Sequence, residues 1–350
     1  MTLRSEGLKA VEDHGGSLEK AEALFPEAPK PWIDLSTGIN PHPYPLLALP
    51  ATVFTRLPEE KRLAELCAIA ASVYGAPSGA NVVAAGGTQI LLPLIASLIP
   101  AGHARILGPT YAEHARAAAL VGHHVEETES FEAFAEADLA IVVNPNNPDG
   151  RVISRAALLD LSRRMQAKGG LLVVDEAFMD VGPRGESLAG DVGRGGIVVL
   201  RSFGKFFGLA GVRLGFALAA PETAARLKAW LGPWAVSGPA LDYGTQALAD
   251  RQWQEKMRRR LSAEAEALDG LFARHGLHSE GGTSLYRFFR HDQAQSLFRH
   301  LGENGILTRR FIDRPRDLRI GLSAGADEME RLGDALAQWS ARHLSKEQAR

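Results

Sequence analysis

The chain has 350 residues, of which 45% are hydrophobic, and carries a formal net charge of -2 at pH 7. This length and apolar content allow a large buried core, and they favour one large domain followed by a smaller one. The near-neutral charge gives no electrostatic reason to expect a nucleic-acid partner. The single cysteine, Cys67, cannot form an internal disulfide, and its apolar helical setting predicts a buried thiol.

The sequence predicts neither a targeting segment nor a membrane span. Residues 1–20 hold no apolar run flanked by basic residues, as a signal peptide would. The longest apolar run, residues 90–99, contains Pro93 and is too short to cross a bilayer. We therefore expect a cytoplasmic protein without a membrane partner.

In the first 200 residues, short apolar runs alternate with helix-length segments. Gly86-Gly87 ends the first run, and Thr88 is placed to cap a helix that extends to residue 99. A second helix is expected at residues 154–168. Short apolar runs of this kind are typical of strands buried on both faces of a parallel sheet, and we predict such strands at residues 103–107, 139–143, 171–174 and 196–200, with a further short strand at 81–85.

This alternation predicts an α/β fold whose sheet is mostly parallel and doubly wound, with ligands at the carboxyl ends of the strands. After about residue 239 the pattern changes to that of a smaller α+β domain, with a helical stretch, two strands and a closing helix at residues 240–275, 284–289, 318–321 and 327–344. We expect an N-terminal arm, a large domain and a small domain, at residues 1–40, 41–238 and 239–350.

Two residues at expected strand ends carry the groups that pyridoxal phosphate needs. The aldehyde of this cofactor takes a lysine amine, and its pyridine nitrogen takes a carboxylate that keeps it protonated. Asp175 ends one apolar run, and Lys205 follows the next. Tyr111 is placed to stack on the pyridine ring, and Asn147, in a rigid turn, to bind its phenolic oxygen. Each residue alone also fits an ordinary surface or capping role.

A second group of residues matches a dianionic phosphate, which binds backbone amides at a helix start, a hydroxyl group and a fixed cation. Gly87 and Thr88 can supply the amides, Ser202 the hydroxyl and Arg213 the guanidinium. Gly87-Thr88 by itself fits a turn equally well. All of these residues in this order predict a pyridoxal phosphate site.

The residues lie in motifs that follow one another in a characteristic order, namely Gly86-Gly87-Thr88-Gln89, Pro109-Thr110-Tyr111, Asn144-Pro145-Asn146-Asn147-Pro148-Asp149-Gly150, Asp175-Glu176-Ala177-Phe178 and Ser202-Phe203-Gly204-Lys205 with Arg213. Over nearly the whole chain, this series resembles the fold-type I pyridoxal phosphate enzymes, in the branch near histidinol-phosphate aminotransferase. The resemblance implies an aspartate aminotransferase-like fold, pyridoxal 5'-phosphate as cofactor and a homodimer with shared active sites.

Within this branch, further details are similar to the threonine-phosphate decarboxylases. They are His14-Gly15-Gly16, residues 34–41, residues 233–237, and Phe178 at a position where the aminotransferases usually carry tyrosine. The resemblance implies decarboxylation of L-threonine O-3-phosphate to (R)-1-amino-2-propanol O-2-phosphate in cobalamin biosynthesis. The alternative is histidinol-phosphate aminotransferase or a related class II aminotransferase, which uses the same lysine and aspartate.

The resemblance also implies a phosphorylated amino acid as substrate and assigns the residues that bind it. Arg309 and Arg319 match arginines that the family uses on substrate acid groups, and planar guanidinium groups suit carboxylate or phosphate. Which arginine takes which group stays open. His14 is a further candidate for the substrate phosphate, and Asn147 also faces the substrate. Lys205 is the expected acid that protonates the α-carbon after carbon dioxide leaves.

Some positions depart from the family pattern. Leu57 stands where the branch commonly has a tyrosine that reaches the cofactor phosphate of the neighbouring subunit, and Leu285 where it has asparagine. A non-catalytic, DNA-binding regulator would need an added recognition module, for which residues 1–40 are too short and unpatterned. No metal pattern is present, and we interpret the remaining histidines as surface or packing residues: His103, His114, His123 and His124.

Overall fold

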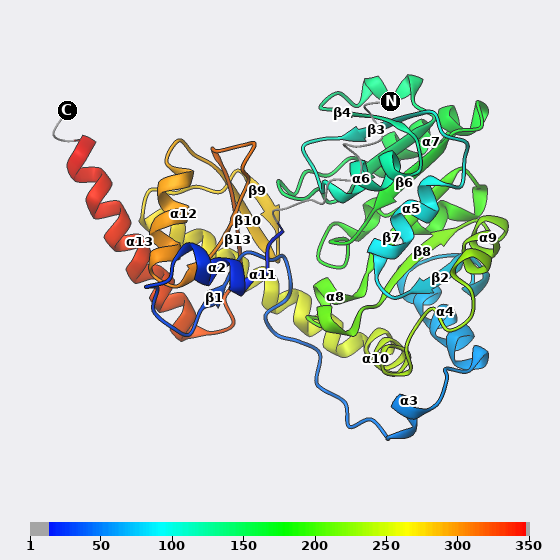
Figure 1. Ribbon diagram of the computed structural model, residues 1–350, viewed down its shortest axis with the longest axis horizontal. Coiled ribbons are helices and arrows are strands. Elements are labelled where there is room, and N and C mark those ends of the chain that lie inside the picture. The colour runs from blue at the N-terminus through cyan, green and yellow to red at the C-terminus, as the bar shows by residue number, and fades with distance from the viewer. Residues whose placement is uncertain (1–13, 348–350) are drawn as a thin grey trace. The chain divides into compact units, whose positions relative to one another are not determined.

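The computed structural model describes residues 14–347, and the chain divides into two compact units (Figure 1). Of the described residues, the first unit contains Pro43–Asn147 and Arg151–Gln254. The second contains residues 14–42, Pro148–Gly150 and residues 255–347. The first residues of the chain, as far as they are described, thus belong to the second unit instead of forming a part of their own.

The first unit is built on a seven-stranded sheet in the order β2-β8-β7-β6-β5-β3-β4. Strand β8 runs antiparallel to β2 and β7, and the other neighbours are parallel. The strands are β2 (Val82–Ala85), β3 (His103–Leu107), β4 (His124–Thr128), β5 (Leu139–Val143), β6 (Leu171–Asp175), β7 (Ile197–Ser202) and β8 (Gly215–Ala219).

The five strands expected from the sequence are confirmed, and β2, β5 and β6 are buried along their whole length. Strands β4 and β8 are not among the expected strands, although β8 is a buried apolar run. Strand β4 is largely exposed and carries charged residues, so it gives no apolar run. Strand β8 is antiparallel because residues 203–214, which connect it to β7, contain only two short helical turns and no full crossover helix.

Local signals set the helix ends in this unit. The hydroxyl of Ser154 accepts a hydrogen bond from Ala157 N–H at 3.3 Å and begins α7. Gly75, with φ of 84°, ends α4. Thr88 is not the cap that the sequence predicts, because Gly87 precedes a 3₁₀ turn, Thr88–Ile90, which leads into α5. The helices are α3 (Thr52–Thr55), α4 (Glu60–Tyr74), α5 (Leu91–Ala96), α6 (Glu113–Leu120), α7 (Arg155–Ala167), α8 (Phe203–Phe206), α9 (Pro221–Leu231) and α10 (Gly238–Ala249).

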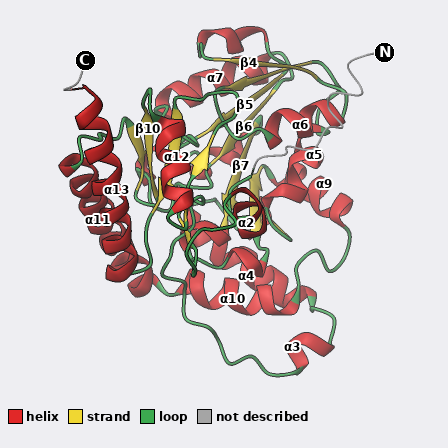
Figure 2. Ribbon diagram, turned by 60° about the vertical axis from the view of Figure 1, so that its left-hand side comes forward, coloured by secondary structure: helices red, strands yellow, loops and turns green. Residues whose placement is uncertain are grey.

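An apolar core lies between this sheet and helices α5, α6 and α9, which group on one side of the strands (Figure 2). Leu91 and Ile95 of α5 pack with Leu227 of α9 and with strand residues such as Ile106 and Val173. Burial of these side chains is the main stabilising term of the sheet and fixes the strand ends.

A buried ion cluster ties β6 to β7 directly behind the strand ends. Arg201 donates to Glu176 at 3.0 Å and to Asp180 at 2.6 Å, and all three residues are at most 3% exposed. The guanidinium of Arg201 also lies 4.3 Å from the centre of the Tyr74 ring. Burial lowers the pKa of Arg201, but Asp180 and Glu176 raise it by more, so this residue remains charged.

We expect the substitution Arg201→Met to destabilise the fold by about 3–5 kcal/mol, because it leaves two buried carboxylates without their cation. Urea unfolding followed by circular dichroism measures this change. The matched control is Arg163→Met, since the side chain of Arg163 is 72% exposed and its ion pair with Asp160 is on the surface. Equal unfolding midpoints for the two variants would contradict the prediction.

The second unit contains two small sheets. Strand β1 (Ile33–Asp34) pairs in parallel with β11 (Ile306–Leu307). A four-stranded antiparallel sheet has the order β12-β13-β10-β9, with β12 (Arg309–Arg310), β13 (Asp317–Gly321), β10 (Tyr286–Arg290) and β9 (Gly281–Thr283). The remaining helices among residues 14–347 are α2 (Leu18–Leu24), α11 (Arg251–Arg274), α12 (Ala294–Glu303) and α13 (Ala326–Glu347).

The predicted helical stretch at residues 240–275 is two helices, α10 and α11. They separate at Asp250, whose carboxylate accepts a hydrogen bond from Trp253 N–H at 2.9 Å. Helix α10 packs against α4 and therefore belongs to the first unit. This packing explains why the first unit extends to Gln254 and does not end at the expected residue 238.

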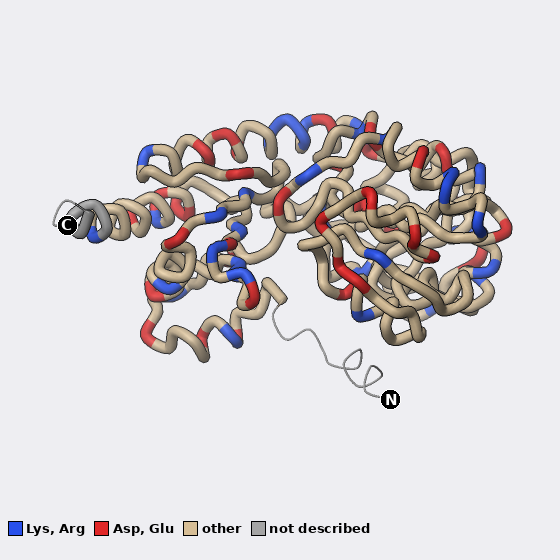
Figure 3. The backbone as a smooth tube through the Cα atoms, turned by 90° about the horizontal axis from the view of Figure 1, so that it is seen from above, with Lys and Arg blue, Asp and Glu red and all other residues tan. Residues whose placement is uncertain are grey.

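Basic and acidic residues are interspersed along both units (Figure 3). Among the described helices, none combines the length and the apolar character that a membrane crossing requires.

Candidate active site

A pocket of about 170 Å³ lies where β5, β6 and β7 end in the first unit. Side chains from five different connections line it, because the carboxyl ends of neighbouring parallel strands meet at one edge. The pocket brings together all the residues that the sequence predicts to bind the cofactor: Gly87, Thr88, Tyr111, Asn147, Asp175, Ser202, Lys205 and Arg213.

Lys205 reaches the pocket from α8, the short helix that begins directly after β7. Its Nζ lies 5.8 Å from the centre of the Phe178 ring, and Phe178 is 3% exposed. The amine is therefore held beside an apolar ring at a half-buried position.

Asp175 is 6% exposed and is oriented by two hydrogen bonds. Its Oδ1 accepts from Ala177 N–H at 3.0 Å, and its Oδ2 lies 2.8 Å from Nε2 of His114. His114 is 2% exposed and packs edge-on against Tyr111. His114 is a buried packing residue and not a surface one, because α6 places it three residues after Tyr111 and directly against the carboxylate. The sequence interpretation missed its contact with Asp175.

We expect the substitution His114→Phe, which keeps a ring but removes the bond to Asp175, to raise the dissociation constant of pyridoxal phosphate roughly 10- to 100-fold, as the loss of a hydrogen bond to a charged group implies. Titration of cofactor absorbance against protein measures this constant. His103, which is exposed, provides the control His103→Phe. Equal cofactor affinity in the two variants would show that His114 only fills space.

At the other end of the pocket, two glycines allow neighbouring groups to lie unusually close to the backbone. Gly87 has φ of 95°, and a β-carbon at this position would lie 2.8 Å from Nη2 of Arg213. Arg213 has a left-handed backbone, with φ of 55°, and donates to the carbonyl of Ala210 at 3.1 Å. Gly215 allows a similarly close approach to Thr88 N, at 2.5 Å from an added β-carbon. Together, the Thr88 amide, the Ser202 hydroxyl and the Arg213 guanidinium offer donors to an anion.

Tyr111 is held by its hydroxyl, which donates to Oε1 of Gln89 at 3.2 Å. Burial, together with Glu113 and Asp175, raises the pKa of Tyr111 to about 12, so the phenol is neutral at physiological pH. The side-chain amide of Gln89 also donates a hydrogen bond to Oε2 of Glu113, at 2.6 Å. Gln89 lines the pocket as well, although the sequence motif Gly86-Gly87-Thr88-Gln89 did not assign it a role there.

Of the predicted substrate residues, Asn147 lines the pocket of the first unit, and His14, Arg309 and Arg319 lie in the second unit. Arg309 of β12 pairs with Arg319 of β13 across the antiparallel ladder. Arg319 is 7% exposed, donates to the carbonyl of Ser36 at 2.7 Å and lies over the Tyr286 ring at 5.1 Å. Arg309 lies over the Phe311 ring at 5.1 Å. His14 is exposed.

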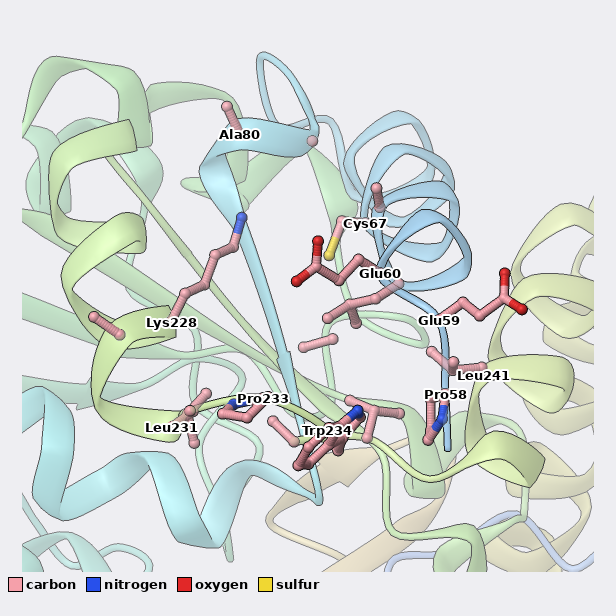
Figure 4. Close-up of a pocket in the computed structure, with 18 residues that line it drawn as sticks. Pro58, Glu59, Glu60, Cys67, Ala80, Lys228, Leu231, Pro233, Trp234 and Leu241 are labelled. Atoms are coloured by element: carbon pink, nitrogen blue, oxygen red, sulfur yellow. The ribbon is translucent and has the colours of Figure 1, made fainter. Parts of the chain in front are cut away.

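A larger pocket, of about 920 Å³, is also present in the first unit (Figure 4). Its walls are mostly apolar, and Lys228, Glu60 and Cys67 are among the residues that line it. Cys67 is 4% exposed on α4, as the sequence predicts, and burial raises the pKa of its thiol. Lys205 and Asp175 belong to the smaller pocket, so size does not identify the reactive site here.

Residues 53–336 match the family of aminotransferases of class I and II. The chain belongs to this family. A threonine-phosphate decarboxylase from Sinorhizobium sp is 44% identical over 93% of this chain and 97% of that protein. A second one, from Pseudomonas aeruginosa, is 43% identical with the same coverage. The fold is similar to that of histidinol-phosphate aminotransferase from Sinorhizobium meliloti in complex with pyridoxal-5'-phosphate, with a TM-score of 0.81, 19% identity and coverage of 98% of both chains.

Proposed function

We propose that this chain is a pyridoxal phosphate-dependent enzyme that decarboxylates L-threonine O-3-phosphate to (R)-1-amino-2-propanol O-2-phosphate, a reaction of cobalamin biosynthesis. The observation that carries the proposal is the 43–44% identity to two threonine-phosphate decarboxylases over nearly the full length of both chains. The complete cofactor pocket supports it, and so does the apolar Phe178 beside Lys205.

The residues of the smaller pocket fit pyridoxal phosphate. The half-buried amine of Lys205 fits its aldehyde, the buried carboxylate of Asp175 fits its pyridine nitrogen, and the ring of Tyr111 fits its face. A β-carbon at Gly87 would lie 2.8 Å from Nη2 of Arg213, so the glycine allows the guanidinium to lie close to the backbone that precedes Thr88 N–H. When bound, the cofactor supplies an electron sink for the bond that breaks at the substrate α-carbon.

The chain's own residues then have separate tasks. Asp175, oriented by His114, keeps a positive charge on the pyridine nitrogen. Nζ of Lys205 would hold the cofactor's aldehyde, and it would deliver a proton to the substrate α-carbon after carbon dioxide leaves. Tyr111 stays neutral because of its raised pKa and packs as a ring, not as an anion.

We propose that the residues that hold the substrate decide which bond at its α-carbon breaks, the bond to the carboxylate or the bond to the hydrogen. In this proposal, the phosphate and the carboxylate of the substrate are bound by Arg309, Arg319 and His14. Asn147 contacts both the cofactor and the substrate. The guanidinium pair across β12 and β13 supports this assignment, because two adjacent cations favour bound anions. A decarboxylase needs the carboxylate perpendicular to the cofactor ring, whereas an aminotransferase needs the α-hydrogen there.

We further propose that the chain acts as a homodimer in the cytoplasm. In the described part of the first unit, the four most exposed large apolar side chains are each more than half exposed, which supports their burial against another chain: Leu46, Phe54, Leu57 and Trp234, at 79%, 66%, 65% and 57%. Light scattering coupled to size-exclusion chromatography gives the mass that tests this assembly.

The function is tested with purified protein and pyridoxal phosphate in two parallel assays. One offers L-threonine O-3-phosphate and measures carbon dioxide; the other offers histidinol phosphate with 2-oxoglutarate and measures glutamate. We expect carbon dioxide in the first assay and no glutamate in the second. Glutamate without carbon dioxide would assign the chain to the aminotransferases instead.

A further inference from the structure

The turn after β1 contacts two segments that carry proposed substrate residues. Ser36 is 1% exposed, and its hydroxyl donates to Oδ1 of Asp34 at 2.6 Å. The same hydroxyl accepts a hydrogen bond from Gly16 N–H at 2.7 Å, two residues after His14. The carbonyl of Ser36 accepts from Nη2 of Arg319 at 2.7 Å. One residue thus joins the chain around His14 to the guanidinium of Arg319.

This turn is fixed on both sides by the small sheets of the second unit. Leu35 N–H donates to the carbonyl of Leu307 at 2.8 Å, and Gly321 N–H donates to the carbonyl of Leu35 at 2.7 Å. The contacts are close enough to require glycine, because an added β-carbon at Gly15 would lie 2.4 Å from the Ser36 carbonyl oxygen. A rigid base of this kind can hold a charged side chain in one orientation.

The surroundings of Arg319 are suited to an anion. The pKa of Arg319 is lowered to about 10, mainly by burial. The neighbouring Arg309 lowers this pKa further, whereas Tyr286 and Asp34 raise it. Asp34 also accepts a hydrogen bond from Ser36 N–H at 2.9 Å. Its negative charge thus offsets part of the repulsion between the two arginines. An incoming phosphate or carboxylate would add further compensation.

We propose that Ser36 is a positioning residue for substrate binding: its hydroxyl fixes the His14 segment, and its carbonyl fixes Arg319, so that both face one anionic group of the substrate. The inference rests on the proposed function, because it takes the anion from the phosphorylated amino acid. It goes beyond that function by assigning a role to a residue that does not itself contact the substrate.

Two variants break the arrangement at different atoms. Ser36→Ala removes the hydroxyl that binds Gly16 N–H but keeps the carbonyl, and Gly15→Ala pushes the His14 segment away from an intact Ser36. Ser262→Ala and Gly270→Ala are matched controls in the same unit, because both residues are exposed and a β-carbon at Gly270 meets nothing within 4 Å.

The holoenzyme of each variant is titrated with inorganic phosphate by calorimetry, and KM and kcat are measured with L-threonine O-3-phosphate. For Ser36→Ala and Gly15→Ala we expect the phosphate dissociation constant and KM to rise about tenfold, the effect of one hydrogen bond of about 1.4 kcal/mol, with kcat changed less than twofold. The controls are expected to match the unaltered enzyme in all three quantities.

An unchanged phosphate affinity and KM in Gly15→Ala, or in a Ser36→Ala variant that melts like the unaltered enzyme, would overturn the inference, since Ser36 would then be only structural. Failure of the unaltered holoenzyme to bind phosphate would also overturn it. Phosphate binding that depends on Ser36, in an enzyme that releases no carbon dioxide, would support this inference while rejecting the proposed function.

Discussion

Replacing Lys205 by alanine is expected to remove the visible absorbance band that reports covalent attachment of pyridoxal phosphate, and to lower decarboxylation by on the order of 10²–10⁴-fold or more, the range for a lost acid–base group. The physical reason is that Lys205 supplies both the amine that binds the aldehyde and the proton for the α-carbon. Absorbance spectra of the purified variant with added cofactor, together with carbon dioxide release, measure both effects.

Lys228→Ala is the control for this experiment. Lys228 is a second lysine of the first unit, and it lines the larger pocket instead of the smaller one (Figure 4). We expect this variant to keep the absorbance band and the activity. A band that persists in Lys205→Ala and disappears in Lys228→Ala would move the reactive site to the larger pocket.

Asp175→Asn is expected to lower kcat by on the order of 10²–10³-fold, the range for removing a preorganised charge that stabilises a transition state. The amide keeps the size of the side chain, and its oxygen can still accept from Ala177 N–H, but it cannot hold a proton on the pyridine nitrogen. Steady-state kinetics with carbon dioxide detection measure the loss. Asp160→Asn, on the exposed face of α7, is the control and should be neutral. An Asp175→Asn enzyme within a fewfold of the original kcat would remove Asp175 from the mechanism.

The sequence predicts the first unit well because its central strands are short apolar runs buried on both faces. Such runs stand out from the amphipathic helices between them, and the polar residues at their ends converge by topology alone. The exposed β4 lacks this signal. The antiparallel direction of β8 depends on the length of its connection to β7, which an apolar pattern does not encode.

The limits of the sequence are clearest for His114 and Ser36. Each makes its contact with a residue far away in the chain, Asp175 in one case and Arg319 in the other. A histidine in a helix, or a serine after a strand, gives no local sign of such a partner. Lys205 and Asp175 were predictable because the chemistry of the cofactor restricts which residue types can stand at those strand ends.

The most direct test of the central claim is to run the reaction of the holoenzyme with L-threonine O-3-phosphate in deuterated water, counting carbon dioxide and analysing the amine product by NMR. The account predicts one carbon dioxide for each substrate consumed and one deuteron at carbon 1 of (R)-1-amino-2-propanol O-2-phosphate, delivered at the former α-carbon. Substrate that exchanges its α-hydrogen, or that loses its amino group when 2-oxoglutarate is added to the same reaction, without release of carbon dioxide, would contradict it.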